Sequence, residues 1–139
     1  TPIDLAYEVD GKRTEADVSS IAVSADLQTN LFPDLGERTI ELYKAEIAKA
    51  GSVFVNGPAG VYEDSRWEKA TKEIWKAIAS CKGYTVIGGG DTITAATKFT
   101  NLEDYSYVCT AGGAMVRFLS GKKLPLIQAM EKAWERDKE

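Results

Sequence analysis

Three short apolar segments between residues 53 and 109 each run into a glycine-rich turn, and each turn leads into a helical pattern. The segments cover residues 53–55, 84–87 and 105–109. Unbroken apolar runs of this length are typical of strands that are buried on both faces. Strands that alternate with helices form a parallel sheet with right-handed crossovers. The sequence therefore predicts an α/β fold of the Rossmann-like kind, a parallel sheet with flanking helices in three layers.

Apolar residues at helical spacing predict the flanking helices. Ile40, Tyr43 and Ile47 indicate a first helix that ends near residue 50. Residues 65–68 have the form of a capping box, a serine followed three positions later by a glutamate, and predict the start of a second helix that Gly83 ends. Further helices are expected over residues 92–98, between the 110–114 turn and Gly121, and over residues 125–134.

The first 36 residues carry a weaker pattern. Residues 3–7 are expected to form a strand, with a turn at Asp10 and Gly11. Residues 18–23 are the candidate for a second strand. The stretch 24–36 is rich in turn-forming residues and is expected to be the least regular part of the chain.

Composition and charge narrow the function. The chain has 139 residues, the size of one domain, and a net charge of −4 from 17 basic and 21 acidic residues. This balance argues against nucleic acid or an anionic membrane as partner, because both would need a basic surface. There is no histidine, which excludes histidine-based triads and histidine-ligated metals. With no C-x-x-C pair, signal peptide or membrane-length apolar run, we expect a cytoplasmic protein with reduced cysteines.

The three glycine-rich turns, at 56–60, 88–92 and 110–114, should lie close together. Parallel strands all end at one edge of the sheet, and ligands of open α/β sheets bind at that edge. Glycine lets the backbone approach a bulky anion, and a helix N-terminus supplies unpaired N–H groups and the positive end of a dipole.

Each turn also has a purely structural explanation. The glycines could allow close strand–helix packing, with Asp91 as an ordinary helix cap, and Glu63 could be a solvated carboxylate. Neither the P-loop motif nor the dinucleotide-binding motif is present. Three such turns on one edge nevertheless favour a site for an anion or a nucleotide.

In order and spacing, the turns resemble the C-terminal part of phosphoglycerate kinase, and the amino-acid sequence around Asn56 is most similar to that of archaeal members. The matching stretches are Asn-Gly-Pro-Ala-Gly-Val-Tyr-Glu at 56–63, Gly-Gly-Gly-Asp-Thr at 88–92, Thr-Ala-Gly-Gly-Ala at 110–114 and Gly-Lys-Lys-Leu-Pro at 121–125. The likeness covers about residues 3–130. That family has two α/β domains, one for 3-phosphoglycerate and one for the Mg-nucleotide.

The resemblance implies that residues 1–139 are the C-terminal portion of the nucleotide-binding domain, with the N-terminal substrate domain absent. A complete enzyme would be roughly three times longer, on a domain-size argument. Its activity would be phosphate transfer between 1,3-bisphosphoglycerate and ADP, giving 3-phosphoglycerate and ATP. The fragment alone is expected to be inactive, and the alternative is a kinase-derived nucleotide-binding or structural module without catalysis.

The resemblance implies nucleotide contacts for four residues in the segment 56–63. Asn56 would lie near the phosphates. Pro58 and Val61 would help to wall the adenine. Glu63 would accept hydrogen bonds from the ribose hydroxyls.

For the phosphate end, the resemblance implies that Asp91 carries Mg²⁺ together with ATP or ADP, and that Thr92 adds a phosphate contact. The glycines would act through their backbone: Gly88, Gly89 and Gly90 by letting the chain approach the phosphates, Gly112 and Gly113 by offering N–H groups to the transferring phosphoryl group. Three positions depart from the family pattern: Ala111 and Ala70 replace glycines, and Cys109 stands where serine is usual. The change at 111 is harmless if its φ is negative.

Overall fold

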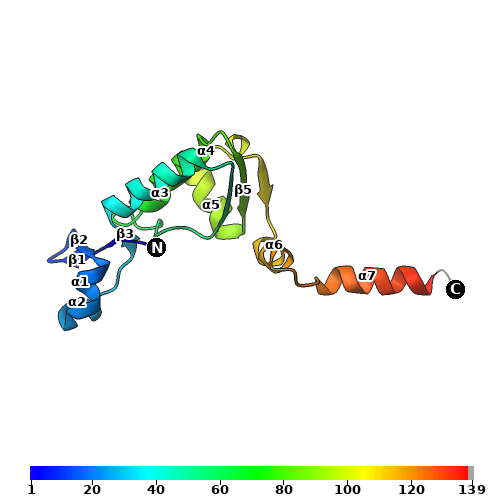
Figure 1. Cartoon of the computed structure of the whole chain (residues 1–139), viewed down its shortest axis with the longest axis horizontal. Helices are drawn as coiled ribbons and strands as arrows, with labels where there is room; N and C mark the ends of the chain where they lie inside the picture. Colours follow the sequence, from blue (N-terminus) through cyan, green and yellow to red (C-terminus); the bar gives the residue numbers. More distant parts are fainter. Residues whose placement is uncertain (138–139) are drawn as a thin grey trace.

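The chain forms two small sheets, and its last helix extends away from both of them (Figure 1). The computed structural model describes residues 1–137. The strands are β1 (Asp4–Val9), β2 (Lys12–Asp17), β3 (Asp34–Leu35), β4 (Ser52–Asn56), β5 (Tyr84–Gly88) and β6 (Tyr107–Cys109). The helices are α1 (Val18–Val23), α2 (Ala25–Gln28), α3 (Glu37–Lys49), α4 (Lys69–Ala79), α5 (Gly90–Phe99), α6 (Gly112–Leu119) and α7 (Pro125–Arg136), with a 3₁₀ turn at Leu102–Asp104. Within this described part, every helix is too short or too polar to cross a membrane.

The parallel sheet has the strand order β4-β5-β6, and it confirms the predicted α/β fold class. Helices α3, α4 and α5 pack on one face of this sheet (Figure 1). Alternate strand residues point to that face, and they join a core of buried apolar side chains. The core contains Ile40, Ile74, Trp75, Ile78, Ile87, Ala95 and Ala96.

The opposite face of the parallel sheet meets α6. Gly88 belongs to this face, and a Cβ at Gly88 would overlap the terminal methyl group of Met115 from α6. Further along the strands the same face carries Phe54, Tyr84 and Tyr107, which are 44%, 58% and 53% exposed. Helix α6 therefore contacts this face only near the carboxyl ends of the strands.

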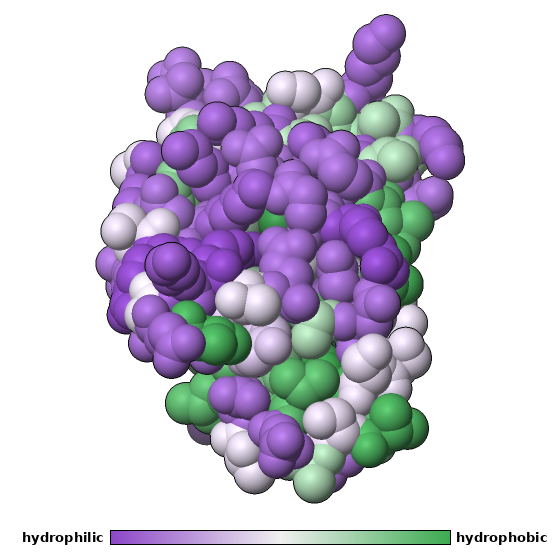
Figure 2. Space-filling view, turned by 90° about the vertical axis from the view of Figure 1, so that its left-hand side faces the viewer, coloured by the Kyte–Doolittle hydropathy of each residue, from purple (hydrophilic) through white to green (hydrophobic). Residues whose placement is uncertain are grey.

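The antiparallel sheet, with order β2-β1-β3, lies next to the N-terminal end of α3 (Figure 1). The predicted turn at Asp10 and Gly11 is confirmed: both have positive φ, as a two-residue hairpin turn requires. Figure 2 shows that this end of the molecule is mainly hydrophilic, with an apolar area below, where α1 and α2 lie in Figure 1.

The prediction of a strand over residues 18–23 is wrong, because this segment is the helix α1. The actual partner of β1 is β2, whose sequence Lys-Arg-Thr-Glu-Ala-Asp has no apolar alternation. The hairpin register already ends at the pair Asp4 and Asp17. Beyond Asp17 the Val18 N–H still bonds to this segment, donating to the Ile3 carbonyl at 3.0 Å, and the following residues satisfy their backbone groups in a helical turn.

The prediction that a capping box at residues 65–68 starts the helix is also wrong, because α4 begins at Lys69 and its N-cap residue Glu68 makes no side-chain cap. Asp64 forms a separate turn instead. Its Oδ1 accepts a hydrogen bond from the Arg66 N–H, and its carbonyl oxygen accepts one from the Trp67 N–H. Side chains of this type compete with the backbone for hydrogen bonds and favour turns over helix starts.

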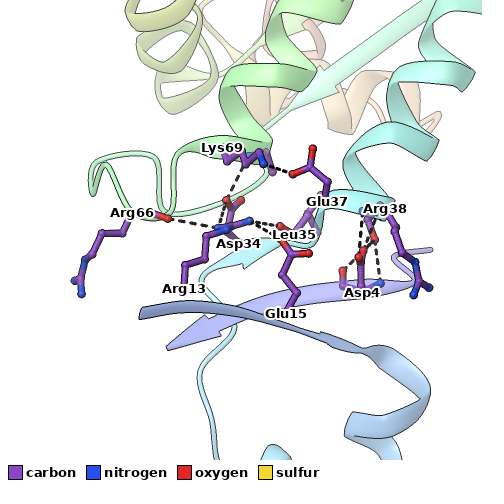
Figure 3. Close-up of polar contacts among 11 residues, drawn as sticks. Asp4, Arg13, Glu15, Asp34, Leu35, Glu37, Arg38, Arg66 and Lys69 are labelled. Carbon is purple, nitrogen blue, oxygen red and sulfur yellow. Dashed lines mark hydrogen bonds and ion pairs between the residues drawn. The ribbon is translucent and has the colours of Figure 1, made fainter. Parts of the chain in front are cut away.

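A remote cap joins the two sheets. The N-cap residue of α3 is Gly36, which has no side chain, and the carboxylate of Asp4 in β1 takes over this role. Its Oδ1 accepts from the Thr39 N–H at 2.8 Å and its Oδ2 from the Arg38 N–H at 3.1 Å (Figure 3). A Cβ at Gly36 would overlap this carboxylate, so the glycine leaves the space that the cap needs. The antiparallel sheet is thereby fixed to α3.

Candidate functional site

The three glycine-rich turns meet at one edge of the parallel sheet, as the topology predicts. Asn56, Gly88 and Cys109 are the last residues of β4, β5 and β6, and they are neighbours in the sheet register. Asn56 Nδ2 donates to the Gly88 carbonyl at 2.9 Å, and the Gly89 N–H donates to the Cys109 carbonyl at 3.0 Å. These two bonds join each turn to the next one.

Helices α5 and α6 begin almost in contact at this edge. A Cβ on Gly112 would lie 2.5 Å from Gly89 Cα, 2.6 Å from Gly89 N and 2.5 Å from Asn56 Nδ2. Gly89 has a φ of +99°, which favours glycine, and Gly113 has nothing within 4 Å of its Cβ position. Only glycine at position 112 therefore lets the two helix N-termini approach this closely.

Neither helix N-terminus is capped by a side chain. The N-cap residues are Gly89 for α5 and Ala111 for α6, and neither makes a side-chain cap bond. The first N–H groups of a helix have no partner within the helix, and their partial positive charge attracts anions. Two such termini at one sheet edge form a surface that can bind a phosphate chain through backbone groups.

Thr92 has a structural role in addition to the one that the resemblance implies. Its side chain is buried, and its Oγ1 accepts a hydrogen bond from the Gly57 N–H at 2.6 Å. Its carbonyl oxygen accepts from Trp75 Nε1 at 3.3 Å. Thr92 therefore holds the 56–60 turn against α5, and a phosphate contact of its hydroxyl stays a prediction.

The two acidic candidates, Glu63 and Asp91, are both exposed. Neither carboxylate makes a hydrogen bond or an ion pair with any part of residues 1–137. Both lie within electrostatic range of Tyr62: burial raises the pKa of the Tyr62 phenol, and the charges of Glu63 and Asp91 raise it further, against the opposing charge of Lys98. Asp91 lies in the first turn of α5. Glu63 instead follows Tyr62, which contacts Lys98 and Phe99 at the other end of this helix.

Asp91 could hold Mg²⁺ only in combination with a bound phosphate. Over residues 1–137 there is no group of three or more acidic or cysteine side chains that could hold a metal ion by itself. Magnesium is usually bound through one or two carboxylates, several waters and substrate phosphates. A single free carboxylate in the first turn of α5 fits that pattern.

Val61 lines a cavity of about 410 Å³. The cavity lies between the loop after β4 and the segment before β3, and it does not include the glycine turns. Its lining consists of Glu8, Thr29, Asn30, Leu31, Pro33, Val61, Asp64 and Trp67. Of these residues, only Val61 was predicted from the sequence. Thr29, Asn30, Leu31 and Pro33 lie in the segment 24–36, where turn-forming residues obscured any pattern. The apolar Leu31 and Phe32 within that segment were the available signal.

Two departures from the family pattern do not disturb the site. Ala111 has a φ of −97°, so its methyl group causes no backbone strain. Cys109 contributes its carbonyl oxygen to the Gly89 N–H, a contact that does not depend on its side chain. The third departure, Ala70, is fully buried at the start of α4.

Comparisons with known proteins agree in pointing to one family. The sequence profile of the phosphoglycerate kinase family matches residues 1–122. The phosphoglycerate kinase of Methanococcus maripaludis is 40% identical over 140 residues, which cover 99% of this chain and 32% of the relative. That of Methanopyrus kandleri is 42% identical over 129 residues, or 93% of this chain and 30% of the relative.

Solved structures give the same result. The phosphoglycerate kinase of Pyrococcus horikoshii superposes with a TM-score of 0.78 at 34% identity, covering 97% of this chain and 33% of that one. The Coxiella burnetii enzyme gives 0.77 at 37% identity, covering 91% and 33%. The chain spans about a third of the length of these relatives. Because sequence and fold match over nearly all of its residues, this chain belongs to the phosphoglycerate kinase family.

Proposed function

We propose that residues 1–139 are the C-terminal portion of the nucleotide-binding domain of a phosphoglycerate kinase, and that they bind Mg-ADP or Mg-ATP. The observation that carries this proposal is the pair of uncapped helix N-termini, α5 and α6, which converge at Asn56. The free carboxylate of Asp91 lies in the first turn of α5, and a second free carboxylate, that of Glu63, lies in the loop after β4. A nucleotide offers matching groups: phosphates for the N–H groups, Mg²⁺ for one carboxylate and ribose hydroxyls for the other.

In this proposal each group has the role that the resemblance implies. Backbone N–H groups at the start of α5 and α6 hold the phosphates, and Gly112 and Gly113 present theirs to the transferring phosphoryl group. Asp91 and the phosphates would hold Mg²⁺, which when bound neutralises charge on the phosphate oxygens. Glu63 accepts from the ribose, and the Val61 cavity accepts the adenine. Phosphoryl transfer needs mainly positioning and charge neutralisation, which these groups supply without a histidine.

The complete reaction, transfer of phosphate between 1,3-bisphosphoglycerate and ADP, requires a second binding surface. A substrate with carboxylate and phosphate groups needs free cationic side chains. Four of the five arginines instead pair with a carboxylate and Arg117 donates to a carbonyl; the pairs are Arg13–Asp34, Arg38–Asp17, Arg66–Asp64 and Arg136–Asp137. The arginines of this chain are thus engaged within it, and we place the 3-phosphoglycerate site in the part of the relatives that this chain does not span, as the resemblance implies.

The nucleotide proposal is tested by calorimetric titration of the 139-residue chain with ADP, with and without Mg²⁺. We expect Asp91→Ala to weaken Mg-ADP binding about ten- to a hundredfold, because a charge-assisted contact contributes about 1.5–3 kcal/mol. Binding of Mg-free ADP should change little. Glu63→Ala should weaken both titrations alike, because its role does not involve the metal.

Glu103→Ala serves as the matched control. Glu103 is exposed and lies beyond the C-terminal end of α5. Its substitution therefore changes the net charge by the same amount at the end of α5 that is remote from the glycine turns. It should leave both titrations unchanged. If the unaltered chain releases no heat with Mg-ADP, the second hypothesis holds, that of a structural module derived from the kinase.

A coupled assay should detect no kinase activity in the 139-residue chain, because the proposed acceptor site lies outside it. The intact Methanococcus maripaludis enzyme, whose corresponding third is 40% identical, provides the positive control. Turnover by the chain above background, at any concentration of 1,3-bisphosphoglycerate and ADP, would contradict this prediction.

A further inference from the structure

The loop over residues 60–70 begins and ends against one buried carboxylate, that of Asp34. At its start, the Val61 N–H donates to the Pro33 carbonyl at 2.8 Å, and a Cβ at Gly60 would overlap Asp34 Oδ1. At its end, the Ala70 N–H donates to Asp34 Oδ2 at 3.3 Å. Asp34 therefore contacts both ends of this loop and holds them together, and the loop carries Val61 and Glu63.

The Asp34 carboxylate depends on Arg13 for its charge. The Asp34 side chain is 0% exposed, and its Oδ1 has no hydrogen-bond partner in the described part of the chain. Burial raises the pKa of Asp34, while the Ala70 N–H and the charge of Arg13 lower it. Arg13 Nη1 donates to Asp34 Oδ2 at 2.8 Å, and Nη2 donates to the Leu35 carbonyl at 2.8 Å. An unpaired buried carboxylate is costly, so removal of Arg13 should open a path for water to Asp34.

Arg13 reaches Asp34 from outside the loop, from β2 of the antiparallel sheet (Figure 3). It also contacts the loop directly. Its Nη1 lies 3.4 Å from the Arg66 carbonyl, and its guanidinium carbon lies 5.8 Å from the ring centroid of the buried Trp67. On the side of the parallel sheet, Lys98 of α5 donates to the Tyr62 carbonyl at 2.6 Å. The loop is thus held from two sides. On the antiparallel sheet, Arg13 with Asp34 provides the buried attachment, and the exposed ion pair between Arg66 and Glu8 of β1 adds a second one.

We propose that Arg13 and Asp34 are positioning residues for the nucleotide: they fix the 60–70 loop on the antiparallel sheet, and through it they place Val61 and Glu63. This inference rests on the proposed function, and it adds a determinant that lies outside the three glycine turns. The β1–β2 hairpin, whose Glu8 lines the Val61 cavity, thereby also becomes part of the binding site's support through Arg13.

The test compares Arg13→Gln with Arg38→Gln in the 139-residue chain. Arg38 forms an exposed ion pair with Asp17 on the same sheet, so its variant loses an equal charge without touching the loop. Hydrogen–deuterium exchange should show amides of residues 60–70 exchanging about tenfold faster in Arg13→Gln, while α5 keeps its protection. Arg38→Gln should leave both regions unchanged. Equal exchange gains in α5 would show a general loss of stability and would overturn the inference.

Two further readouts separate positioning from folding. Mg-ADP should bind about tenfold more weakly to Arg13→Gln: the dissociation constant should rise, while the heat released per binding site should stay the same. The double variant R13Q/D34N should recover loop protection, because the buried charge that needed Arg13 is gone. Faster loop exchange with unchanged Mg-ADP affinity, or no recovery in the double variant, would overturn the inference. If the unaltered chain binds no Mg-ADP, the proposed function fails, and the exchange comparison still decides whether Arg13 holds the loop.

Discussion

Gly112→Ala should lower the free energy of unfolding by about 3 kcal/mol and remove Mg-ADP binding, because overpacking against backbone atoms cannot relax through a side-chain rotation. The added methyl group would lie 2.5 Å from Gly89 Cα and 2.6 Å from Gly89 N. Relief requires α6 to move away from α5, which separates the two helix N-termini that the phosphates would bridge. Urea unfolding at pH 7 measures the first effect, and calorimetric titration measures the second.

Gly113→Ala is the matched control for this change. It adds the same methyl group one residue further along α6, where nothing lies within 4 Å. Alanine is a better helix former than glycine by up to about 1 kcal/mol, so stability should stay the same or rise slightly. Its N–H group is retained, so nucleotide binding should persist. If the two variants are equally stable, the close approach of α5 and α6 at Gly112 does not exist in solution.

The parallel half of this fold could be predicted because each of its signals is local. A buried strand, a glycine turn and a helix follow one another three times, and topology then places all three turns at one edge. The contact between Gly89 and Gly112 joins residues that are distant in the sequence, but the two turns that contain them were already predicted to meet. The sequence could not show which of these glycines has room for a side chain. Gly112 is enclosed by backbone atoms, whereas Gly113 has open space around its Cβ position.

The antiparallel half was poorly predicted because its stability comes from contacts across the chain. Strand β2 is polar, and only its register with β1 and the position of Arg13 explain why it forms. Likewise, nothing local marks Asp4 as the cap of a helix that begins at Glu37. The cavity at Val61 was missed for the same reason, since Leu31 and Pro33 reach it from the segment before β3. Long-range polar contacts of this kind leave no periodic pattern in a sequence.

Asp4→Ala should lower the free energy of unfolding at pH 7 by about 3 kcal/mol, because it leaves the Thr39 N–H and the Arg38 N–H without their acceptor. The Thr39 hydroxyl loses its bond to the carboxylate and can still donate to the Asp4 carbonyl. The effect should depend on pH. Burial by itself would raise the pKa of Asp4, but hydrogen bonds from Thr39 and Arg38 outweigh it and hold the pKa below its ordinary value of 3.8. A carboxyl whose pKa is lower in the folded state stabilises the protein above 3.8 and loses this contribution as the pH falls through the folded value.

The difference in stability between the unaltered chain and Asp4→Ala should therefore be constant above about pH 5 and shrink below it. The two proteins must be compared at each pH, because Asp34 gives stability an opposite dependence on pH. Burial raises the pKa of Asp34, so Asp34 stabilises the fold less as the pH rises above 3.8. Asp34 is present in both proteins and cancels. Asp17→Ala, which removes an exposed carboxylate paired with Arg38, should change stability by no more than about 0.5 kcal/mol. An Asp4→Ala effect that stays constant down to pH 2 would mean that the carboxylate charge does not stabilise α3. The cap that joins the two sheets would then act by shape alone.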